Sequence, residues 1–167
     1  MRDETLEQLL MEEVKLVYKY LKKMGTSKED AEDIVQETIY MTFKNIDSID
    51  KNKIRAWLFK VAINNYYNLY NKKKKQNSIL FDESENLKIF NESTEDNLLT
   101  QEKKRYIEKA LDLLKPSYKE LLILKYVLDL SYKDIARIFD MKEEKTKTYL
   151  YRARNKFKEI WEGLDLG

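Results

Sequence analysis

The sequence contains no cysteine and no histidine, and only three glycines and one proline among its 167 residues. Without cysteine, disulfides and thiolate metal sites are excluded, and without histidine the chain lacks the commonest metal ligand and the usual general base. We therefore expect no catalytic activity, no metal and no cofactor. So few turn-forming residues, in a chain with abundant Lys, Glu, Leu and Ile, favour helices joined by short polar connections.

Long apolar runs are also missing. No stretch approaches the roughly 20 apolar residues that span a bilayer, so we expect no membrane insertion. The N-terminal stretch MRDETLEQLL is too acidic and too interrupted for a signal peptide. Together with the absence of cysteine, these features predict a protein of the reducing cytoplasm.

The charged residues are strongly segregated, although the net charge is only +2. Residues 1–50 carry 12 acids and 7 bases, whereas residues 51–75 carry 8 bases and no acid. Residues 76–99 carry 6 acids and one base, and residues 142–158 carry 7 bases and 2 acids. Two basic patches therefore lie apart on an otherwise acidic chain.

Apolar residues recur at helical spacing along most of the chain, which predicts an all-α fold. In the first 75 residues the pattern indicates three helices, separated near Gly25 and by the polar stretch NIDSIDKNK. Gly25 suits a left-handed helix end, and Ser27, with Asp30 three residues later, resembles a capping box. We expect residues 1–75 to form the first of two small helical domains.

Residues 76–99 lack sustained periodicity and are acidic, so we expect a flexible linker there. Residues 100–167 contain four further helical patterns and form the second expected domain. Pro116 suits a first helical turn, and Ser131, with Asp134 three residues later, suits a cap. The last two patterns predict a short helix and a longer basic helix joined by a tight connection. This arrangement is typical of a helix-turn-helix.

The chain resembles the extracytoplasmic-function (ECF) group of bacterial sigma factors in three segments that follow one another in the family's order: DAEDIVQETIYMTFKNID, RAWLFKVAINNYYNLYNKKKK and LDLLKPSYKELLILKYVLDLSYKDIARIFDMKEEKTKTYLYRARNKFK. The resemblance covers nearly the whole chain. It implies an N-terminal domain that melts and recognises the minus-ten promoter element and a C-terminal helix-turn-helix that recognises the minus-thirty-five element.

The same resemblance implies several protein partners. Both domains should bind core RNA polymerase, at the clamp helices of its largest subunit and at the flap of its second-largest subunit. An anti-sigma factor should bind the free protein, which we expect to be a monomer. The apolar run LLILKYV is most simply part of the core, although its outward residues could also receive the polymerase flap.

The second predicted helix has a polar face opposite its apolar stripe. The face consists of Asp33, Gln36, Glu37 and Tyr40. By itself this pattern indicates only a solvated helix surface. Because the matching family segment binds the polymerase clamp helices, the resemblance implies that these four residues contact polymerase.

The third predicted helix has a stripe of amide, aromatic and cationic side chains. Unpaired bases need hydrogen bonds to their edges and flat surfaces for stacking, while lysine contacts phosphates, so the stripe suits single-stranded DNA. Trp57 at the start of the helix is as simply explained as a core residue. The resemblance implies that this helix and the loop before it hold a flipped base, with Asn64 at a matching position. The candidate minus-ten residues are Trp57, Lys60, Asn64, Tyr67, Asn68 and Asn71.

The lysines at 72–75 have two open explanations, a solvated helix end and a phosphate contact at the edge of the duplex. The last helix has a clearer face, turned away from its apolar stripe, which we expect to enter the major groove. This face consists of Lys147, Thr148, Tyr151 and Arg152. Beyond it, Arg154, Lys156 and Lys158 extend the positive charge and are expected to hold phosphates.

The turn of the helix-turn-helix departs from the family pattern. Asp140, Met141 and Lys142 replace the usual glycine and small hydroxyl cap, and Thr146 occupies a position that is usually apolar. These departures predict either an irregular turn or a recognition helix that starts late, and Asp140 is a residue that can tolerate the left-handed backbone that glycine normally provides.

The sequence is compatible with four functions. The leading one is a sigma factor, a promoter-specificity subunit of RNA polymerase without catalytic activity of its own. The alternatives are a sigma-like regulator of a mobile element or toxin operon, a helix-turn-helix repressor that dimerises through its N-terminal module, and a helical scaffold. The stripe on the third helix favours the sigma factor, because neither a repressor nor a scaffold needs side chains placed for single-stranded DNA.

Overall fold

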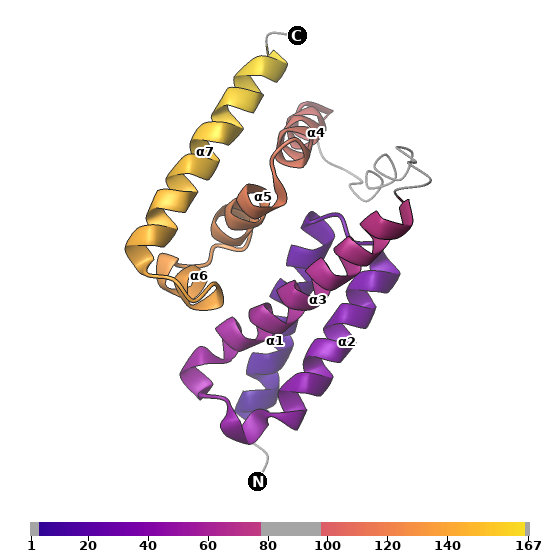
Figure 1. The fold of residues 1–167 in the computed structure, drawn as a ribbon, viewed down its shortest axis with the longest axis vertical. Coiled ribbons are helices and arrows are strands. Elements are labelled where there is room, and N and C mark those ends of the chain that lie inside the picture. Colours follow the sequence, from indigo (N-terminus) through magenta and orange to yellow (C-terminus); the bar gives the residue numbers. More distant parts are fainter. Residues whose placement is uncertain (1–3, 78–97, 166–167) are drawn as a thin grey trace.

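The structure is a computed structural model that describes residues 4–77 and 98–165. Within these two ranges the regular secondary structure is helical throughout, so the expected all-α fold is confirmed. Figure 1 shows two groups of helices, one from each range. The predicted linker at residues 76–99 lies, apart from its ends, outside the described residues.

The N-terminal group consists of three helices and two single 3₁₀ turns. These are α1 (Glu4–Lys23), α2 (Lys28–Lys44), η1 (Ile46–Ser48), η2 (Lys51–Lys53) and α3 (Ile54–Asn77). Gly25 has φ 97° and ends α1 with hydrogen bonds from Gly25 N to Lys22 O and from Thr26 N to Leu21 O, both 3.1 Å. The Ser27 side chain accepts a hydrogen bond from Asp30 N at 3.1 Å. Both predicted helix signals are therefore confirmed.

The C-terminal group consists of four α-helices and one π-helical turn. These are α4 (Leu98–Asp112), α5 (Pro116–Leu122), η4 (Ile123–Val127), α6 (Tyr132–Ile138) and α7 (Glu143–Asp165). Pro116 stands in the first turn of α5, and the Ser131 side chain accepts a hydrogen bond from Asp134 N at 3.0 Å. The four predicted helices of this region are present.

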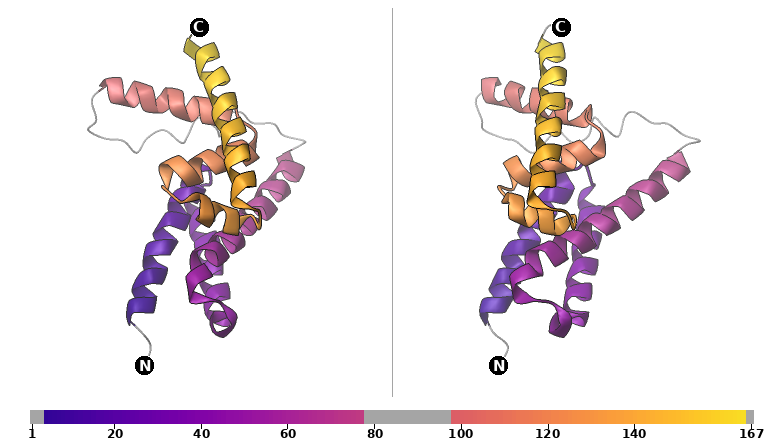
Figure 2. Two further views of the ribbon diagram at one scale, coloured as in Figure 1. Left: turned by 90° about the vertical axis from the view of Figure 1, so that its left-hand side faces the viewer. Right: turned by 60° about the vertical axis from the view of Figure 1, so that its left-hand side comes forward.

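The two groups pack against each other. Helix α6 lies on α3, as the orange and magenta ribbons show in Figure 2, and η4 contacts α1. Buried apolar residues of both groups, such as Leu21 and Leu58 on one side and Ile123 and Ile135 on the other, belong to one continuous cluster. The sequence led us to expect two separate cores, whereas this structure joins them.

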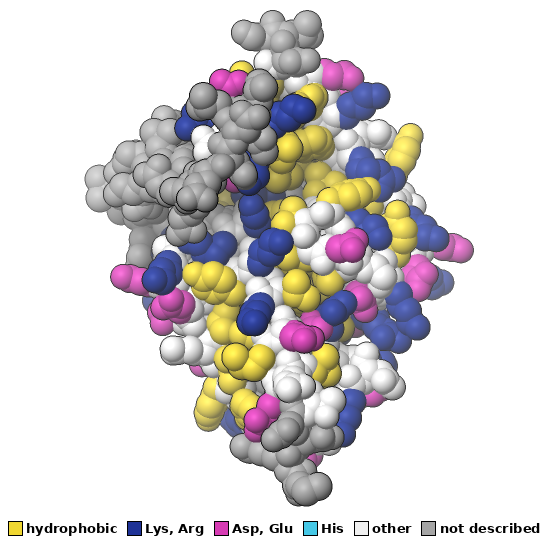
Figure 3. Space-filling view, turned by 180° about the vertical axis from the view of Figure 1, so that it is seen from behind, with side chains coloured by type: hydrophobic (Ala, Val, Ile, Leu, Met, Phe, Trp, Pro, Cys, Tyr) yellow, Lys and Arg dark blue, Asp and Glu magenta, His cyan; other side chains and the backbone are white. Residues whose placement is uncertain are grey.

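Hydrophobic side chains also reach the surface of both groups. Figure 3 shows them from behind, interspersed with basic and acidic side chains. The large exposed ones include Met11, Phe43, Tyr106 and Leu113. None of the helices in residues 4–77 and 98–165 is both long and apolar enough to cross a bilayer.

Candidate nucleic-acid interface

The turn of the helix-turn-helix is regular in spite of its unusual sequence. Asp140 has φ 52°, in the left-handed region. Met141 N donates to Ala136 O at 2.9 Å and Asp140 N donates to Arg137 O at 3.4 Å, which is the hydrogen-bond pattern of a Schellman motif. Asp140 therefore adopts the left-handed backbone conformation that glycine usually provides. The recognition helix α7 begins at Glu143, directly after the turn.

Thr146 is fully buried at the position where the family usually has an apolar residue. Its hydroxyl donates to Lys142 O at 3.2 Å, one turn earlier in α7. Because this local bond satisfies the hydroxyl, the threonine can present its methyl group to the core without leaving an unpaired polar atom. The departure from the family pattern thus leaves the helix packing intact.

The predicted major-groove face of α7 is exposed. Lys147, Thr148, Tyr151 and Arg152 all face solvent, whereas Leu150 and Ala153 are fully buried on the opposite side of the helix. The Thr148 hydroxyl donates to Glu144 O at 3.0 Å, one turn earlier in α7. A shallow depression of about 540 Å³ is lined by Tyr132, Lys147, Thr148, Tyr151 and Arg154.

Tyr132 joins this surface from the start of α6, although the sequence did not single it out. Lys125 Nζ lies 4.1 Å and Lys147 Nζ 5.4 Å from the centre of its ring. Both distances are within the range of cation–π attraction. Tyr132 therefore holds two lysine ammonium groups close to the mouth of the depression.

Arg154, a predicted phosphate contact, is tied to the fold more firmly than its neighbours. Its Nη1 donates to the Tyr126 hydroxyl at 2.9 Å. Lys156 forms an ion pair with Glu159, which lies one helical turn later. The distance from Nζ to Oε2 is 3.3 Å, and both side chains are exposed. These two cations flank the predicted base-facing surface on the side of the C-terminus of α7.

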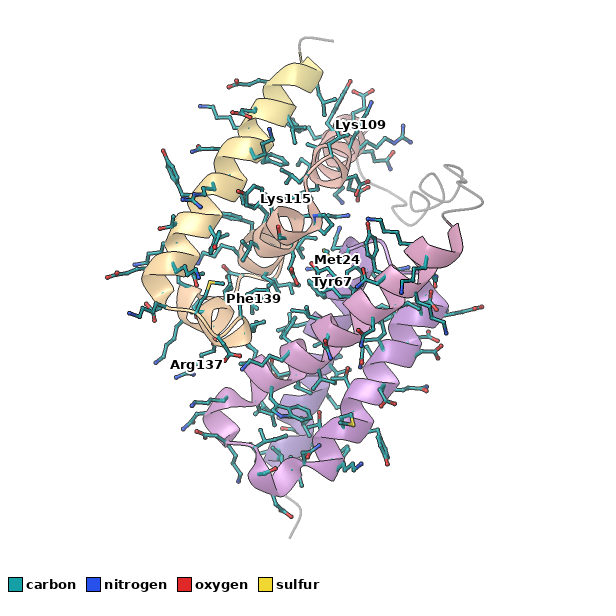
Figure 4. All side chains as sticks on the ribbon, in the orientation of Figure 1. Met24, Tyr67, Lys109, Lys115, Arg137 and Phe139 are labelled. Carbon is teal, nitrogen blue, oxygen red and sulfur yellow. The ribbon has the colours of Figure 1, made fainter. Side chains whose placement is uncertain are left out.

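The predicted minus-ten stripe on α3 is split between solvent and the C-terminal group. Asn64, Asn68 and Asn71 are exposed. In contrast, Lys60 Nζ lies 2.7 Å from Asp140 Oδ1, and the Tyr67 hydroxyl donates to Glu120 Oε2 at 2.8 Å. Figure 4 shows Tyr67 on the side of α3 that faces α5. Both partners, Asp140 and Glu120, belong to the other helical group.

The remaining candidates around α3 have simpler surroundings. Trp57 is partly buried and packs against the core, as its alternative explanation predicts. Lys73, from the run of four lysines, pairs with Asp30 of α2. This ion pair is the main cause that lowers the pKa of the Asp30 carboxyl below its ordinary value.

Glu120 is a buried carboxylate at the contact between the groups, with only 4% of its surface exposed. Its Oε1 accepts a hydrogen bond from the Tyr20 hydroxyl at 2.9 Å, and its Oε2 accepts the bond from Tyr67. Burial raises the pKa of the Glu120 carboxyl, while the two hydrogen bonds act in the opposite direction. Burial and the neighbouring Glu120 also raise the pKa of Tyr67 well above its ordinary value.

Arg55 at the start of α3 connects three helices. Its Nε and Nη2 donate to the two carboxylate oxygens of Glu13, both at 2.8 Å, and its Nη1 donates to Asp134 Oδ2 at 3.0 Å. The Glu13 side chain is 5% exposed, so Arg55 neutralises a buried charge. Near this site, at the end of α6 labelled in Figure 4, Arg137 Nη1 donates to Asn52 O at 3.3 Å.

The predicted polymerase face of α2 is open. Asp33, Gln36, Glu37 and Tyr40 are all exposed, and Tyr40 is 60% exposed. They stand opposite the buried residues Ala31, Ile34 and Thr38 of the same helix. In the run LLILKYV, Leu121 to Leu124 are buried and Tyr126 is 55% exposed, which favours the core explanation for most of it. Among the residues that the structure describes, no group of acidic side chains could hold a metal ion.

Sequence reasoning missed Tyr132, Arg55 and Glu120. A charged residue inside the apolar run KELLILKYV was a signal for Glu120, because an acid among core positions requires a partner. Arg55 and Tyr132 had no comparable signal, since their partners Glu13, Asp134 and Lys147 are distant or ambiguous in sequence.

Two helical groups, the second ending in a helix-turn-helix with an exposed cationic face, are the arrangement of a DNA-binding protein. Residues 9–76 match the family described as sigma-70 region 2, and residues 104–157 match the family described as sigma-70, region 4. The two regions lie in this order within one chain, which neither a repressor nor a scaffold would require.

The relatives give the family more narrowly. Over 159 residues the chain is 31% identical to the ECF RNA polymerase sigma factor SigM of Bacillus subtilis. The aligned region covers 94% of this chain and 95% of the relative. It is 28% identical to the ECF RNA polymerase sigma factor SigW of the same organism, over 83% of this chain and 79% of the relative. The chain belongs to the ECF family of RNA polymerase sigma factors.

Solved structures share the fold. The sigma factor RpoE from Bartonella quintana, crystallised with the anti-sigma factor NepR, has a TM-score of 0.72 at 22% identity and covers 96% of this chain and 98% of its own. CnrH, in complex with the cytosolic domain of CnrY, has a TM-score of 0.69 at 18% identity and covers 97% and 91%. The match extends over both helical groups.

Proposed function

We propose that this sigma factor directs core RNA polymerase to its promoters through two surfaces for DNA and two for polymerase, and has no catalytic activity of its own. The observation that carries the proposal is the pair of matched regions in one chain, together with the exposed cationic face of α7 and the exposed amides of α3. The proposal assigns the first domain to residues 1–75, the linker to residues 76–99 and the second domain to residues 100–167.

The minus-thirty-five element is assigned to α7. Lys147 and Arg152 can donate to guanine edges, the methyl group of Thr148 can contact a thymine methyl, and Tyr151 can pack on bases or sugars. Arg154 and Lys156 flank this face and hold phosphates, which sets the position of the helix on the duplex but carries no sequence information. The exposure of the four central side chains supports this division.

The minus-ten element is assigned to α3 in its single-stranded form. The exposed amides of Asn64, Asn68 and Asn71 can pair with base edges, and Lys60 and Tyr67 can contact a phosphate and a base. Trp57 remains a candidate for stacking at the start of the helix. Only unpaired bases offer the edges and faces that such a stripe can use.

Polymerase is assigned to the α2 face of Asp33, Gln36, Glu37 and Tyr40. Large hydrophobic side chains left exposed on both groups, among them Phe43, Tyr106 and Leu113, are typical of a protein that binds a large partner. We assign a second contact, with the polymerase flap, to the C-terminal group. An anti-sigma factor is a further expected partner, since RpoE and CnrH were each solved with a bound protein. We place the site of action in the cytoplasm, as the absence of cysteine predicts.

In vitro transcription tests the function as a whole. Purified core polymerase and this chain, incubated with fragmented genomic DNA, should give transcripts that start at a small set of positions sharing one upstream sequence. Core polymerase alone, and core polymerase with a chain truncated after residue 77, are the controls. Transcripts with no common upstream sequence would contradict the assignment of promoter recognition to this chain.

Asn64→Ala then tests the α3 assignment. If Asn64 pairs with a base that is exposed only after melting, the variant should bind the promoter duplex with polymerase but open it poorly. Permanganate reactivity of unpaired thymines, compared at equal promoter occupancy, measures opening. Glu32→Ala on the exposed surface of α2 serves as a control, and equal opening by both variants would remove Asn64 from the site.

A further inference from the structure

Tyr132, the first residue of α6, stands beside the recognition helix without belonging to it. Its side chain is half-buried and packs against the apolar core. The same side chain lines the depression on the surface of α7, next to Lys147 and Thr148. From this place Tyr132 can act on the predicted major-groove face from a second helix.

The backbone on both sides of Tyr132 is held in place. In the loop before α6, Leu130 N donates to Leu124 O at 3.0 Å. Ser131 then caps α6, because its hydroxyl accepts a hydrogen bond from Asp134 N at 3.0 Å. A tyrosine side chain has only two torsion angles to restrain. The ring of Tyr132 is therefore a rigid support for any flexible side chain that lies on it.

Lys147, on the exposed face of α7, is such a side chain. Its Nζ lies 5.4 Å from the centre of the Tyr132 ring, and Lys125 Nζ lies 4.1 Å from it. A ring attracts a cation at distances up to about 6 Å. Lys125 also donates to Leu130 O at 3.3 Å, which ties it to the loop before α6. The ring thus brings a lysine of the recognition helix close to a side chain anchored elsewhere in the fold.

The hydroxyl of Tyr132 acts on a third cation. Burial lowers the pKa of the Arg154 guanidinium, but the hydroxyls of Tyr126 and Tyr132 together raise this pKa above its ordinary value. Arg154 Nη1 donates to the Tyr126 hydroxyl at 2.9 Å. Arg154 therefore keeps a partner when the hydroxyl of Tyr132 is removed, so the ring and the hydroxyl can be tested separately.

We propose that Tyr132 is a positioning residue of the minus-thirty-five interface, whose ring holds the ammonium group of Lys147 for one base pair and so sets how strictly this base pair is recognised. The inference rests on the base-reading role proposed for Lys147. A lysine has a flexible stem of four carbons, and ordering this stem on DNA costs conformational entropy. A ring that restrains the stem before binding lowers this cost for one arrangement only. The gain is therefore specific to one base pair.

The size of the effect follows from the strength of the contact. Attraction between an exposed lysine and an aromatic ring corresponds to about two- to fivefold in an equilibrium constant. Tyr132→Leu removes the ring but keeps an apolar side chain against the core, so it should lower the preference at one base pair by this factor. Lys147→Ala should lower the preference at the same base pair by about tenfold. Tyr132→Phe keeps the ring and should retain the preference.

Tyr118→Leu is the matched control. Tyr118 on α5 is also half-buried and packed against the core, and Lys115 Nζ lies 4.2 Å from the centre of its ring. The same substitution there removes a similar contact away from the depression and should leave every base preference unchanged. All these tyrosine variants keep the charge of the parent protein, so general attraction to phosphates is equal. Should Tyr132→Leu lose its cooperative thermal unfolding, Tyr132→Met replaces it.

The preferences are measured with holoenzyme assembled from core polymerase and the full chain of each variant. The probe is a pool of duplexes with a random segment of about two helical turns between constant ends. Bound duplexes are recovered and sequenced, and the base frequencies at each position give the preference independently of overall affinity. The double variant of Tyr132→Leu and Lys147→Ala should lose no more preference than Lys147→Ala alone, because the ring acts through this lysine.

The outcomes separate a positioning role from a structural one. A loss confined to the base pair that Lys147→Ala affects, and absent from Tyr132→Phe and Tyr118→Leu, supports the proposal. Unchanged preference in Tyr132→Leu overturns it, and so does a loss spread over all positions, which a distorted fold would cause. An equal loss in Tyr132→Phe assigns the effect to the hydroxyl and overturns the role of the ring.

Failure of the proposed function gives a different result. If the parent holoenzyme enriches a sequence but Lys147→Ala leaves every preference unchanged, the base-reading role of Lys147 is wrong, and the inference is overturned with it. If the parent holoenzyme enriches no sequence, promoter recognition through α7 is itself overturned, together with the role of Tyr132.

Discussion

The turn at Asp140 permits a quantitative test of how an unusual sequence maintains the helix-turn-helix. Asp140 has φ 52°, a backbone conformation that glycine adopts freely, that aspartate tolerates and that alanine disfavours. We therefore compare Asp140→Gly with Asp140→Ala. Both variants remove the carboxylate and its ion pair with Lys60, so they differ in how the residue accepts the left-handed backbone and in the freedom of the unfolded chain.

The expected difference follows from two opposing contributions. A left-handed conformation costs alanine about 1–2 kcal/mol relative to the right-handed one. Glycine has greater freedom in the unfolded chain, which offsets about 0.4–1 kcal/mol of this advantage. Asp140→Gly should therefore be more stable than Asp140→Ala by about 1 kcal/mol, which for a chain of this length corresponds to about 2–4 °C in Tm.

Asp140→Asn isolates the ion pair with Lys60, because asparagine also tolerates the left-handed region. The pair is partly exposed, so its loss should cost at most about 1 kcal/mol at low salt and less at high salt. Unfolding in urea, followed by circular dichroism at low and at high salt, measures all three variants. Equal stability of Asp140→Gly and Asp140→Ala would refute the backbone argument, and a loss in Asp140→Asn that salt does not reduce would refute the ionic one.

Three further predictions concern other sites. Arg55→Ala should destabilise the protein by about 2–3 kcal/mol in urea unfolding, because the buried Glu13 carboxylate loses its partner; a loss below about 0.5 kcal/mol would contradict this role. Arg152→Ala should relax base preference at one minus-thirty-five position by about 1–3 kcal/mol, whereas Lys156→Ala should weaken all sequences equally and lower the salt slope by about one; titrations of the full chain with duplexes that differ by single bases distinguish the two. Because burial raises the pKa of Glu120, the folded protein holds a proton on this carboxyl at pH values where the unfolded chain has lost it. Glu120 therefore lowers the stability of the protein as the pH rises above the ordinary pKa of about 4.5. Glu120→Gln should gain stability relative to the parent between about pH 5 and pH 7, and parallel profiles of stability against pH would refute the assignment.

The helix ends and helix faces of this protein could be predicted from the sequence, because neighbouring residues determine them. Gly25, Ser27, Pro116 and Ser131 mark helix ends through hydrogen bonds or backbone angles that involve residues within five positions, and the structure contains each of them. The faces of α2 and α7 followed in the same way, since helical spacing alone determines which side chains share a face. The chemistry of one residue likewise allowed a left-handed backbone at Asp140, but only the structure distinguished it from an irregular turn.

The family could also be predicted from the sequence, because the family is recognised by residue patterns that follow one another in a fixed order along the chain. Three segments sufficed to indicate a sigma factor, and the matched regions 2 and 4 confirmed it. The roles of single residues at the DNA and polymerase faces stay predictions, since exposure permits a contact without identifying the partner. Their tests depend on binding and transcription measurements.

Only the tertiary structure determined how the two helical groups meet. Glu120 and Tyr20 are 100 positions apart, Glu120 and Tyr67 are 53 apart, and Lys60 and Asp140 are 80 apart. No helical period or capping rule relates residues at such separations, because each helix satisfies its own backbone and buries its own stripe whichever way the other group lies. The sequence by itself therefore determined the helices, the turn and the family, whereas long-range complementarity between side chains determined that Lys60 and Tyr67, on the stripe predicted for DNA, also bind the chain's own C-terminal group.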